Sequence, residues 1–320
     1  MRVRLGYVAI SKKLGKKVTS SSTVTFSNYN KIALPDKKLE KLKSVAASNL
    51  KDLETIIRYN IENYIHFYRI TSALIPLVTH PEVGYWGHRE FLKKDFEYVG
   101  KLIHDSKMRV DTHPDEFNVI NSINPKVVEN TKINLLRQAE WFEDFKYDLG
   151  KMVMHVGGAT NGKKAGLERF INNFNTFPGE VKSKIIIEND DKTYTAQETL
   201  NLCNELNLPM VLDIHHHNCN NNGENIYELI PKIFLTWKNE KLPPKLHFSS
   251  PRNGEKDRKH SDFIDPKDFV AFLENIKSFN TDIDIMLECK EKDLALFKLT
   301  NEIKELKPEY KWIDKSTFIV

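Results

Sequence analysis

Apolar residues gather in eight short runs, and longer segments of mixed polarity separate these runs along the whole chain. Several runs, such as Lys184–Glu188 (KIIIE), are apolar without alternation, as expected of strands buried on both faces of a parallel sheet. The runs that we expect to form strands are Val3–Ile10, Tyr64–Thr71, Met108–Thr112, Lys151–Val156, Lys184–Glu188, Met210–His215, Lys245–Phe248 and Asp284–Glu288.

The segments between the runs carry helical periodicity, most clearly Asp36–Asn63, where apolar residues recur at three- and four-residue steps. Asn124-Pro125 and Asp265-Pro266 each place a capping residue before a proline in the first helical turn. This alternation of strand and helix predicts a parallel sheet with right-handed crossovers. We therefore expect an α/β fold, a single (β/α)8 TIM barrel formed as one domain by residues 1–320. The tail from Pro308 is predicted to extend the last helix and its exit.

Composition excludes several classes of protein. An open, dinucleotide-binding sheet is disfavoured because no glycine-rich phosphate loop follows the first run. The three cysteines form no paired spacing, which argues against a disulfide framework and against a zinc ribbon. The chain has no signal peptide and no apolar stretch long enough to span a bilayer, so we expect a cytoplasmic protein without a membrane partner. The net charge of +4 permits an acidic partner but does not prove one.

Each predicted strand from the third to the eighth has an ionisable side chain at or near its end. In barrel enzymes, the carboxyl ends of the strands form the active-site face. An isolated buried charge is costly, so each of these six strand ends would need its own explanation. One shared explanation is more plausible, and a cluster of divalent metals provides it. Imidazole and carboxylate together suit zinc, manganese or iron(II). The candidate ligands are His113, His155, Glu188, Asp213, His216, His247, His260 and Glu288.

Because one metal takes about four protein ligands or fewer, this set predicts two or three ions, with Glu188 or another carboxylate bridging them. Clustered ions are typical of phosphoryl chemistry. Taken alone, His155 would more often be a hydrogen-bonded core histidine, and the run His215–His217 could be a surface loop or an adventitious metal site. The prediction therefore depends on the joint pattern.

Basic residues cluster in the loops of the same predicted face. Lys12 and Lys13 follow the first strand, and Arg252 and Arg258 follow the seventh. Such side chains around a metal site suit contacts with a phosphate backbone, although solvated surface charge is the alternative.

Several segments in order along the chain resemble a known family. They are RLGYVAISKKLGKK, RITSALIPLVTHPE, THPDEFNVINS, KMVMHVGG, IIIENDD, VLDIHHHNCN, KLHFSS and DRKHSDFID. Together they resemble UV damage endonucleases of the bacterial type, from Val3 to about Glu288. That family is similar in fold to the endonuclease IV-type apurinic nucleases.

The resemblance implies a TIM barrel with three divalent metals, most commonly Mn²⁺. It implies incision of damaged double-stranded DNA immediately 5′ of cyclobutane pyrimidine dimers and 6-4 photoproducts, and at abasic sites. From the sequence we infer no obligate protein partner. The resemblance further implies three ligand sets, namely His113, His155 and Glu188 for one ion, Glu188, Asp213, His247 and Glu288 for a second, and His216 and His260, with Asp257 as a weaker candidate, for a third.

The resemblance also suggests catalytic roles beside Glu188. Lys245 lies where the family carries a carboxylated lysine, and an ordinary cationic lysine that touches phosphate is the alternative. His80 matches an active-site histidine, and a plain loop residue is its alternative.

Three residues match positions at which the family contacts DNA. Tyr7 is one, although it could instead be an aromatic packed at the barrel mouth. Where the family has a glutamine and an aromatic, this chain has Glu116 and Phe117. Phe117 can still stack on a base or wedge a step, whereas phosphate would repel Glu116 unless it faces a base amine or a cation.

Two other functions remain open from the sequence. A metal-dependent sugar isomerase or epimerase on the same barrel would need fewer ions and a closed pocket. A non-catalytic DNA-binding barrel would keep the fold, but it would have no need of a complete ligand set.

Overall fold

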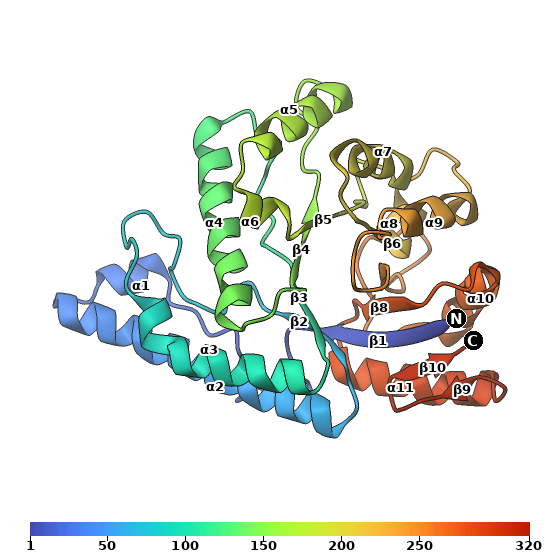
Figure 1. The fold of residues 1–320 in the computed structure, drawn as a ribbon, viewed down its shortest axis with the longest axis horizontal. Helices are drawn as coiled ribbons and strands as arrows, with labels where there is room; N and C mark the ends of the chain where they lie inside the picture. The colour runs from blue at the N-terminus through green and yellow to red at the C-terminus, as the bar shows by residue number, and fades with distance from the viewer.

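Eight parallel strands close into a barrel in the computed structural model, which describes residues 1–320 (Figure 1). The strands pair in chain order from β2 to β8, and β1 pairs with both β8 and β2, which completes the ring. The predicted TIM barrel is therefore confirmed. The strands are β1 (Arg2–Val8), β2 (Phe67–Ile70), β3 (Arg109–Thr112), β4 (Lys151–His155), β5 (Ile185–Glu188), β6 (Met210–Asp213), β7 (Lys245–Phe248) and β8 (Ile283–Leu287).

Helices connect successive strands on the outside of the barrel. The predicted helix Asp36–Asn63 is α2, which lies beside α3 along one flank (Figure 1). Asn124 and Asp265 cap helices as predicted, each accepting a hydrogen bond from a backbone amide of the first turn. The helices are α1 (Phe26–Asn30), α2 (Pro35–Glu62), α3 (His88–Asp105), α4 (Pro125–Asp144), α5 (Lys163–Asn175), α6 (Gly179–Lys182), α7 (Ala196–Leu206), α8 (Ile214–Cys219), α9 (Ile226–Leu235), α10 (Pro266–Ile276), the 3-10 turn η1 (Lys277–Phe279) and α11 (Lys292–Leu306).

Several strands are shorter than predicted, for local reasons. β1 ends at Val8 because Ala9 has a φ of 59°, and β2 begins only after Tyr64, whose φ is 58°. Both angles lie in the left-handed region, which breaks an extended chain. β6 ends at Asp213 because this residue caps α8.

The tail from Pro308 differs from its prediction. It does not extend α11 but forms a hairpin of β9 (Lys311–Trp312) and β10 (Thr317–Ile319), and β10 pairs antiparallel with β1. Proline ends the helix because it lacks an amide donor. Phe318 then buries its ring against Tyr310 and Trp312, which secures the hairpin.

The interior of the barrel is divided between apolar and ionic side chains. Between the barrel and the helices around it, 68 buried residues of strands and helices form one hydrophobic cluster. A second cluster, Val153, Ile186, Val211 and Trp237, joins the inner side chains of β4, β5 and β6. Tryptophan thus fills part of the barrel beneath the active-site face.

The barrel interior also holds five charged residues, which we call the ion ladder: Arg4, Arg109, Asp284, Lys245 and Asp111. Arg4 and Arg109 both bond to Asp284, with Nη-to-Oδ2 distances of 2.5 and 2.7 Å. Next to them, Lys245, the register partner of Asp284, has its Nζ 2.5 Å from Asp111 Oδ2. Because four of the five side chains are buried, their charges are compensated by one another rather than by water.

None of the helices combines the length and the apolar composition needed to cross a membrane.

Candidate active site

Glu188, the last residue of β5, stands at the centre of a cluster of imidazoles and carboxylates. Three groups of side chains place their ligand atoms within 4.8 Å of one another, and Glu188 belongs to all three. The structure thus brings together all the predicted ligands except His260. The groups are His113, His155 and Glu188, then Glu188, Asp213 and His216, then Glu188, His247 and Glu288.

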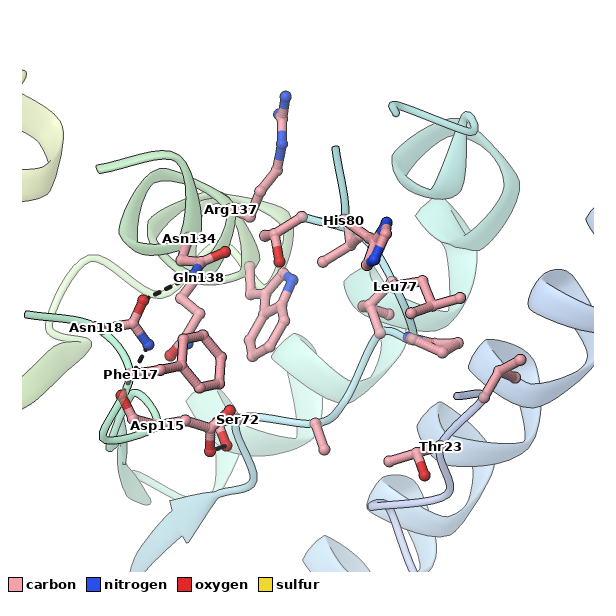
Figure 2. Close-up of a pocket in the computed structure, with 17 residues that line it drawn as sticks. Thr23, Ser72, Leu77, His80, Asp115, Phe117, Asn118, Asn134, Arg137 and Gln138 are labelled. Atoms are coloured by element: carbon pink, nitrogen blue, oxygen red, sulfur yellow. Dashed lines mark hydrogen bonds between the residues drawn. The ribbon is translucent and has the colours of Figure 1, made fainter. Parts of the chain in front are cut away.

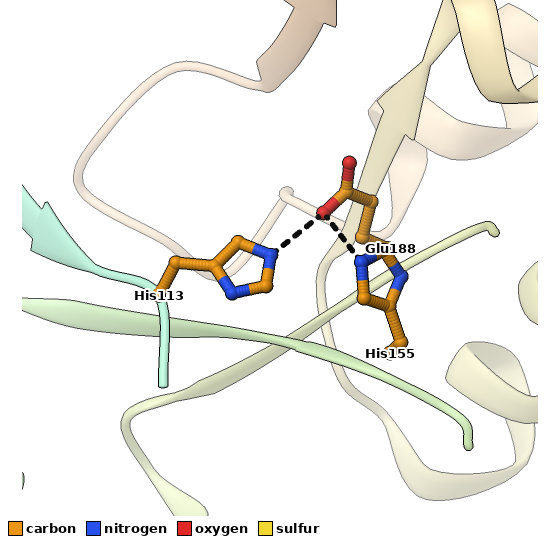
Figure 3. A group of neighbouring side chains, drawn as sticks. All are labelled: His113, His155 and Glu188. Atoms are coloured by element: carbon orange, nitrogen blue, oxygen red, sulfur yellow. Dashed lines mark hydrogen bonds and ion pairs between the residues drawn. The ribbon is translucent and has the colours of Figure 1, made fainter. Parts of the chain in front are cut away.

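Each carboxylate oxygen of Glu188 faces two imidazoles. Oε2 lies 3.2 Å from His113 Nε2 and 3.6 Å from His155 Nε2, and Figure 3 shows these two rings converging on it. Oε1 lies 2.7 Å from His247 Nδ1 and 3.4 Å from His216 Nδ1. Four rings directed at one carboxylate make Glu188 the natural bridge between neighbouring ions.

The strand register explains this convergence. His155 is the register partner of Glu188, and Asp213 that of His247, so the ligands lie at one level of the barrel. The following residue, Asn189, fixes Asp213 by donating to its carbonyl and accepting from its amide. Parallel strands with matched ends therefore build the site from residues far apart in sequence.

The carboxylates stay ionised despite their burial. Burial alone would raise the pKa of Glu188, but electrostatic attraction by His247 and His155, with hydrogen bonds from His113 and His247, holds that pKa well below its usual range. Burial likewise opposes ionisation of Glu288, and Arg69 is the main group that keeps the pKa of this carboxyl low. Both groups are therefore available as anionic ligands at neutral pH.

One carboxylate oxygen of the cluster has no hydrogen-bond partner, as expected where a cation binds. Asp213 Oδ2 is buried and takes part in no hydrogen bond. Such atoms destabilise a fold unless a ligand satisfies them. The donor set of imidazole and carboxylate fits divalent zinc, manganese or iron.

The predicted third ion has a less complete site. The ring centroid of His260 lies 6.3 Å from that of His216, but His260 belongs to none of the three groups. The carboxylate of Asp257 accepts hydrogen bonds from Asn253 and Lys259 of its own loop. A third ion at His216 and His260 therefore stays a prediction.

A mostly polar cavity of about 1040 Å³ opens above the cluster. Phe117 and Glu116 stand exposed on the loop that follows β3, and Phe117 keeps 63% of its surface accessible. Arg258 also lines this cavity, and it pairs with Asp191 at 3.5 Å. The cavity is thus open, polar and bordered by one protruding aromatic ring.

Cations flank a second opening of the same face. Arg69, Arg258, Lys259, Lys290 and Lys292 line it. The predicted DNA-binding residues of the loops are exposed as well, namely Lys12, Lys13 and Arg252. Their side chains are free to meet a phosphate backbone, apart from a 3.5 Å pair between Lys12 and Glu291.

The predicted contact of Tyr7 with DNA has no support from the geometry. Its ring is fully buried against Tyr68, and its hydroxyl donates to Asn60 Oδ1 at 2.7 Å. Burial also raises the pKa of Tyr7 well above its usual range. The alternative, an aromatic packed beneath the barrel mouth, describes this residue correctly.

Lys245 cannot contact phosphate as a cation, because it is fully buried and bonded to Asp111. Burial lowers the pKa of Lys245 to about 8, with Asp111 opposing that shift. Its carboxylation stays a prediction.

His80 lies outside the ligand cluster, so its predicted catalytic role has no support from the geometry. It lines a separate cavity of about 250 Å³, shown in Figure 2, and stacks on Phe26 with ring centroids 3.9 Å apart. The loop that carries Phe117 lines both this cavity and the cleft. A catalytic role for His80 therefore stays a prediction, and the structure places this residue beside the cleft.

Sequence reasoning missed Arg69, although it lies in one of the recognised segments. Its guanidinium contacts Glu288 at 2.6 Å and His247 at 2.7 Å, in the centre of the cluster. The available signal was a charged residue at the end of a buried apolar run, as at the ends of the six later strands.

A family model described as UV-endonuclease UvdE matches residues 3–316. The chain belongs to the UvdE family. A UV DNA damage endonuclease of Halalkalibacterium halodurans is 37% identical over 307 residues, which cover 95% of each protein. One from Bacillus cereus is 35% identical over 308 residues, with 96% of each covered. The predicted resemblance is therefore confirmed.

Solved structures agree with the assignment to the UvdE family. The crystal structure of SacUVDE superposes with a TM-score of 0.83 at 30% identity, covering 95% of this chain and 99% of that one. Endonuclease IV from Thermus thermophilus gives 0.53 at 13% identity, with 79% and 94% covered. An L-ribulose 3-epimerase gives 0.52 at 12% identity, with 83% and 84% covered. The last two likenesses show a shared fold alone.

Proposed function

We propose that this protein is a metal-dependent DNA repair endonuclease that incises damaged double-stranded DNA immediately 5′ of UV lesions. The observation that carries the proposal is the set of three ligand groups joined by Glu188 at the floor of an open polar cleft. Membership of the UvdE family and the names of the curated relatives support the substrate. Cyclobutane pyrimidine dimers, 6-4 photoproducts and abasic sites are the proposed lesions.

The seven clustered ligands would hold the ions, which we propose to be Mn²⁺, up to three per chain with His260 included. Bound there, divalent ions supply charge stabilisation to a phosphate and make water a stronger acid. The ionised carboxylates of Glu188 and Glu288 keep the ligand set anionic, and Asn189 keeps Asp213 directed into it. A scissile phosphate would thus lie over the end of β5.

Phe117 and the surrounding cations would hold the duplex. Phe117 would stack on a base next to the unstacked lesion, and Glu116 beside it would avoid phosphate by facing a base amine. Damaged nucleotides unstack more readily, which favours them over intact ones. Lys12, Lys13, Arg252 and Arg258 would contact the backbone. We further propose that residues 1–320 act as one domain in the cytoplasm without an obligate protein partner.

A sugar isomerase or epimerase is the weaker proposal. Small-molecule sites are usually lined mainly by apolar side chains and bury most of their ligand. This cleft is open, and only three of its twenty lining residues are hydrophobic.

The decisive test is incision of an end-labelled duplex that carries one thymine dimer, beside an undamaged duplex of the same sequence. We expect a single cut just 5′ of the dimer in Mn²⁺, and no cut in excess chelator or by the His113→Ala variant. Cutting only at an abasic site would move the activity toward apurinic nucleases. Absence of cutting on both substrates, in a protein that still takes up metal, would contradict the proposal.

Truncating Phe117 should weaken discrimination between damaged and intact DNA. Base–aromatic stacking contributes about 1–3 kcal/mol per base, so Phe117→Ala should lower binding to the dimer duplex by about 5- to 150-fold. Uptake of Mn²⁺ should not change, because Phe117 belongs to none of the ligand groups. Fluorescence anisotropy on both duplexes measures the effect.

Phe91→Ala is a matched control, because Phe91 is also exposed but lies on α3, outside the cleft. Equal losses of binding in the two variants would show that Phe117 has no special role at the lesion.

A further inference from the structure

Asp293 is a buried carboxylate that no cation neutralises. It lies in the first turn of α11, and none of its surface is exposed. It forms no ion pair, and the nearby ammonium group of Lys12 pairs with Glu291 instead, at 3.5 Å. The charge of Asp293 must therefore be compensated by hydrogen-bond donors and by the N-terminus of its helix, because a buried charge without compensation is costly.

Three of the four donors to Asp293 belong to the loop that follows β1. The amide of Lys12 donates to Oδ1 at 2.6 Å, whereas the hydroxyl of Ser11 and the amide of Lys13 donate to Oδ2 at 2.7 and 3.3 Å. The fourth donor is the hydroxyl of Tyr59 on α2, which lies 2.9 Å from Oδ2. One carboxylate thus holds three consecutive residues of one loop.

The barrel fixes the start of the same loop. Ala9 turns the chain with a φ of 59°, and its amide donates to the carbonyl of Arg69 at 2.9 Å. The carbonyl of Ala9 accepts from the hydroxyl of Tyr68 at 2.5 Å. Further along, Ser11 Oγ accepts from the amide of Leu14 at 3.2 Å. Hydrogen bonds therefore hold the loop from Ala9 to Leu14.

A fixed backbone thus carries free side chains. Lys12 and Lys13 are exposed, although their amides are bonded to a buried anion. Movement of the loop would leave that anion without its donors, and an unsatisfied buried charge destabilises the fold. A loop that is ordered before binding loses less conformational entropy when it meets a ligand.

We propose that Asp293 is a positioning residue, which holds the loop Ser11–Leu14 so that Lys12 and Lys13 meet phosphates of the damaged duplex without further ordering. This inference rests on the DNA-binding role proposed above for the two lysines. Asp293 itself touches neither DNA nor the ions, because it is fully buried and belongs to none of the ligand groups.

Replacing the carboxylate by an amide removes the acceptor and keeps the shape of the side chain. In Asp293→Asn, one oxygen becomes an NH₂ group, which only donates. The amides of Lys12 and Lys13 bond to different oxygens of the carboxylate. Whichever oxygen is replaced, one of these two amides would face another donor, so the loop would be released at that residue.

The test is binding of the thymine-dimer duplex in chelator, measured by fluorescence anisotropy over a range of salt concentrations. We expect Asp293→Asn to bind about 5- to 30-fold more weakly, the loss for ordering about one residue of backbone on binding. In a chain with Lys12→Ala and Lys13→Ala, the slope of log affinity against log salt should become shallower by about two, since each phosphate contact contributes about 0.9. Adding Asp293→Asn to that chain should change its affinity by no more than about twofold.

Asp268→Asn is the matched control. Asp268 also lies in the first turn of a helix that follows a barrel strand, but it holds no residue of the loop after β1. This variant should bind the duplex as wild type does. Equal losses of affinity in Asp268→Asn and Asp293→Asn would overturn the inference, because the charge at a helix N-terminus would then explain both.

The double-mutant cycle distinguishes positioning from general structural support. If Asp293→Asn weakened binding as much without the two lysines as with them, Asp293 would not act through them and the inference would fail. Unchanged binding by Asp293→Asn, or an unchanged salt slope without the lysines, would also overturn it. Incision at the dimer by wild type is measured separately, so its absence would contradict the proposed function and leave the coupling between Asp293 and the lysines to be judged by binding.

Hydrogen exchange in the wild-type chain does not depend on how the variants fold. The amides of Lys12 and Lys13 should exchange at least about tenfold more slowly than those of Lys16 and Lys17, which lie in the same exposed segment without hydrogen-bond acceptors. Equal rates for the two pairs would contradict the inference.

Discussion

Replacing Glu188 by glutamine should lower the rate of incision at a thymine dimer by about 10³-fold or more, because charge placed at the reacting group is usually the largest catalytic contribution. An amide keeps the shape of the side chain but removes the one negative charge that all three ligand groups share. Its NH₂ group would also face imidazoles that now meet an oxygen. Single-turnover incision in Mn²⁺ measures the loss.

Glu129→Gln is the control, since this exposed glutamate of α4 pairs only with Lys132 at the surface. Binding of the damaged duplex by Glu188→Gln should remain measurable, because Phe117 and the basic loops are untouched. Near-normal incision by Glu188→Gln would show that Glu188 does not bridge the catalytic ions.

The second large effect is on stability. Asp284→Ala should lower the free energy of unfolding by about 3–5 kcal/mol, the usual loss when one member of a buried ion pair is removed. Asp284 accepts from Arg4 and from Arg109, and the guanidinium of Arg109 is almost completely buried. The substitution leaves these cations without a carboxylate inside the barrel. Urea denaturation of the metal-free chain measures the change.

Asp282→Ala is closely matched, because Asp282 precedes β8 and forms an exposed pair with Arg2 at 3.4 Å. Exposed pairs contribute about 0–1 kcal/mol, so this variant should unfold nearly as wild type does. Similar losses in the two variants would mean that the ion ladder does not stabilise the barrel.

The ligand cluster was predictable because one geometric rule governs it. Every parallel strand of a barrel ends on the same face, so His155, Glu188 and Asp213 could be grouped without knowing any distance. The family resemblance added the order of the motifs. Neither the barrel geometry nor the family resemblance fixes the distances among side chains. The proximity of His216 to Glu188, for example, depends on the turn in which Asp213 caps α8.

The failures have equally specific causes. The contact of Tyr7 with DNA was expected from the family resemblance, but in the structure its hydroxyl bonds to Asn60 of α2. The tail was expected to extend the last helix, and only contact with β1 makes it a strand. Arg69 was not among the predicted site residues because a guanidinium has no lone pair to offer a metal.

The division of the barrel interior has a consequence for the heat capacity. Unfolding exposes the apolar cluster around Trp237, which raises the heat capacity, but it also exposes the five residues of the ion ladder, which lowers it. A barrel filled in this way should show a smaller heat-capacity increment on unfolding than one filled with aliphatic residues alone. Its curve of stability against temperature would then be flatter, and the fold would persist over a wider range of temperatures.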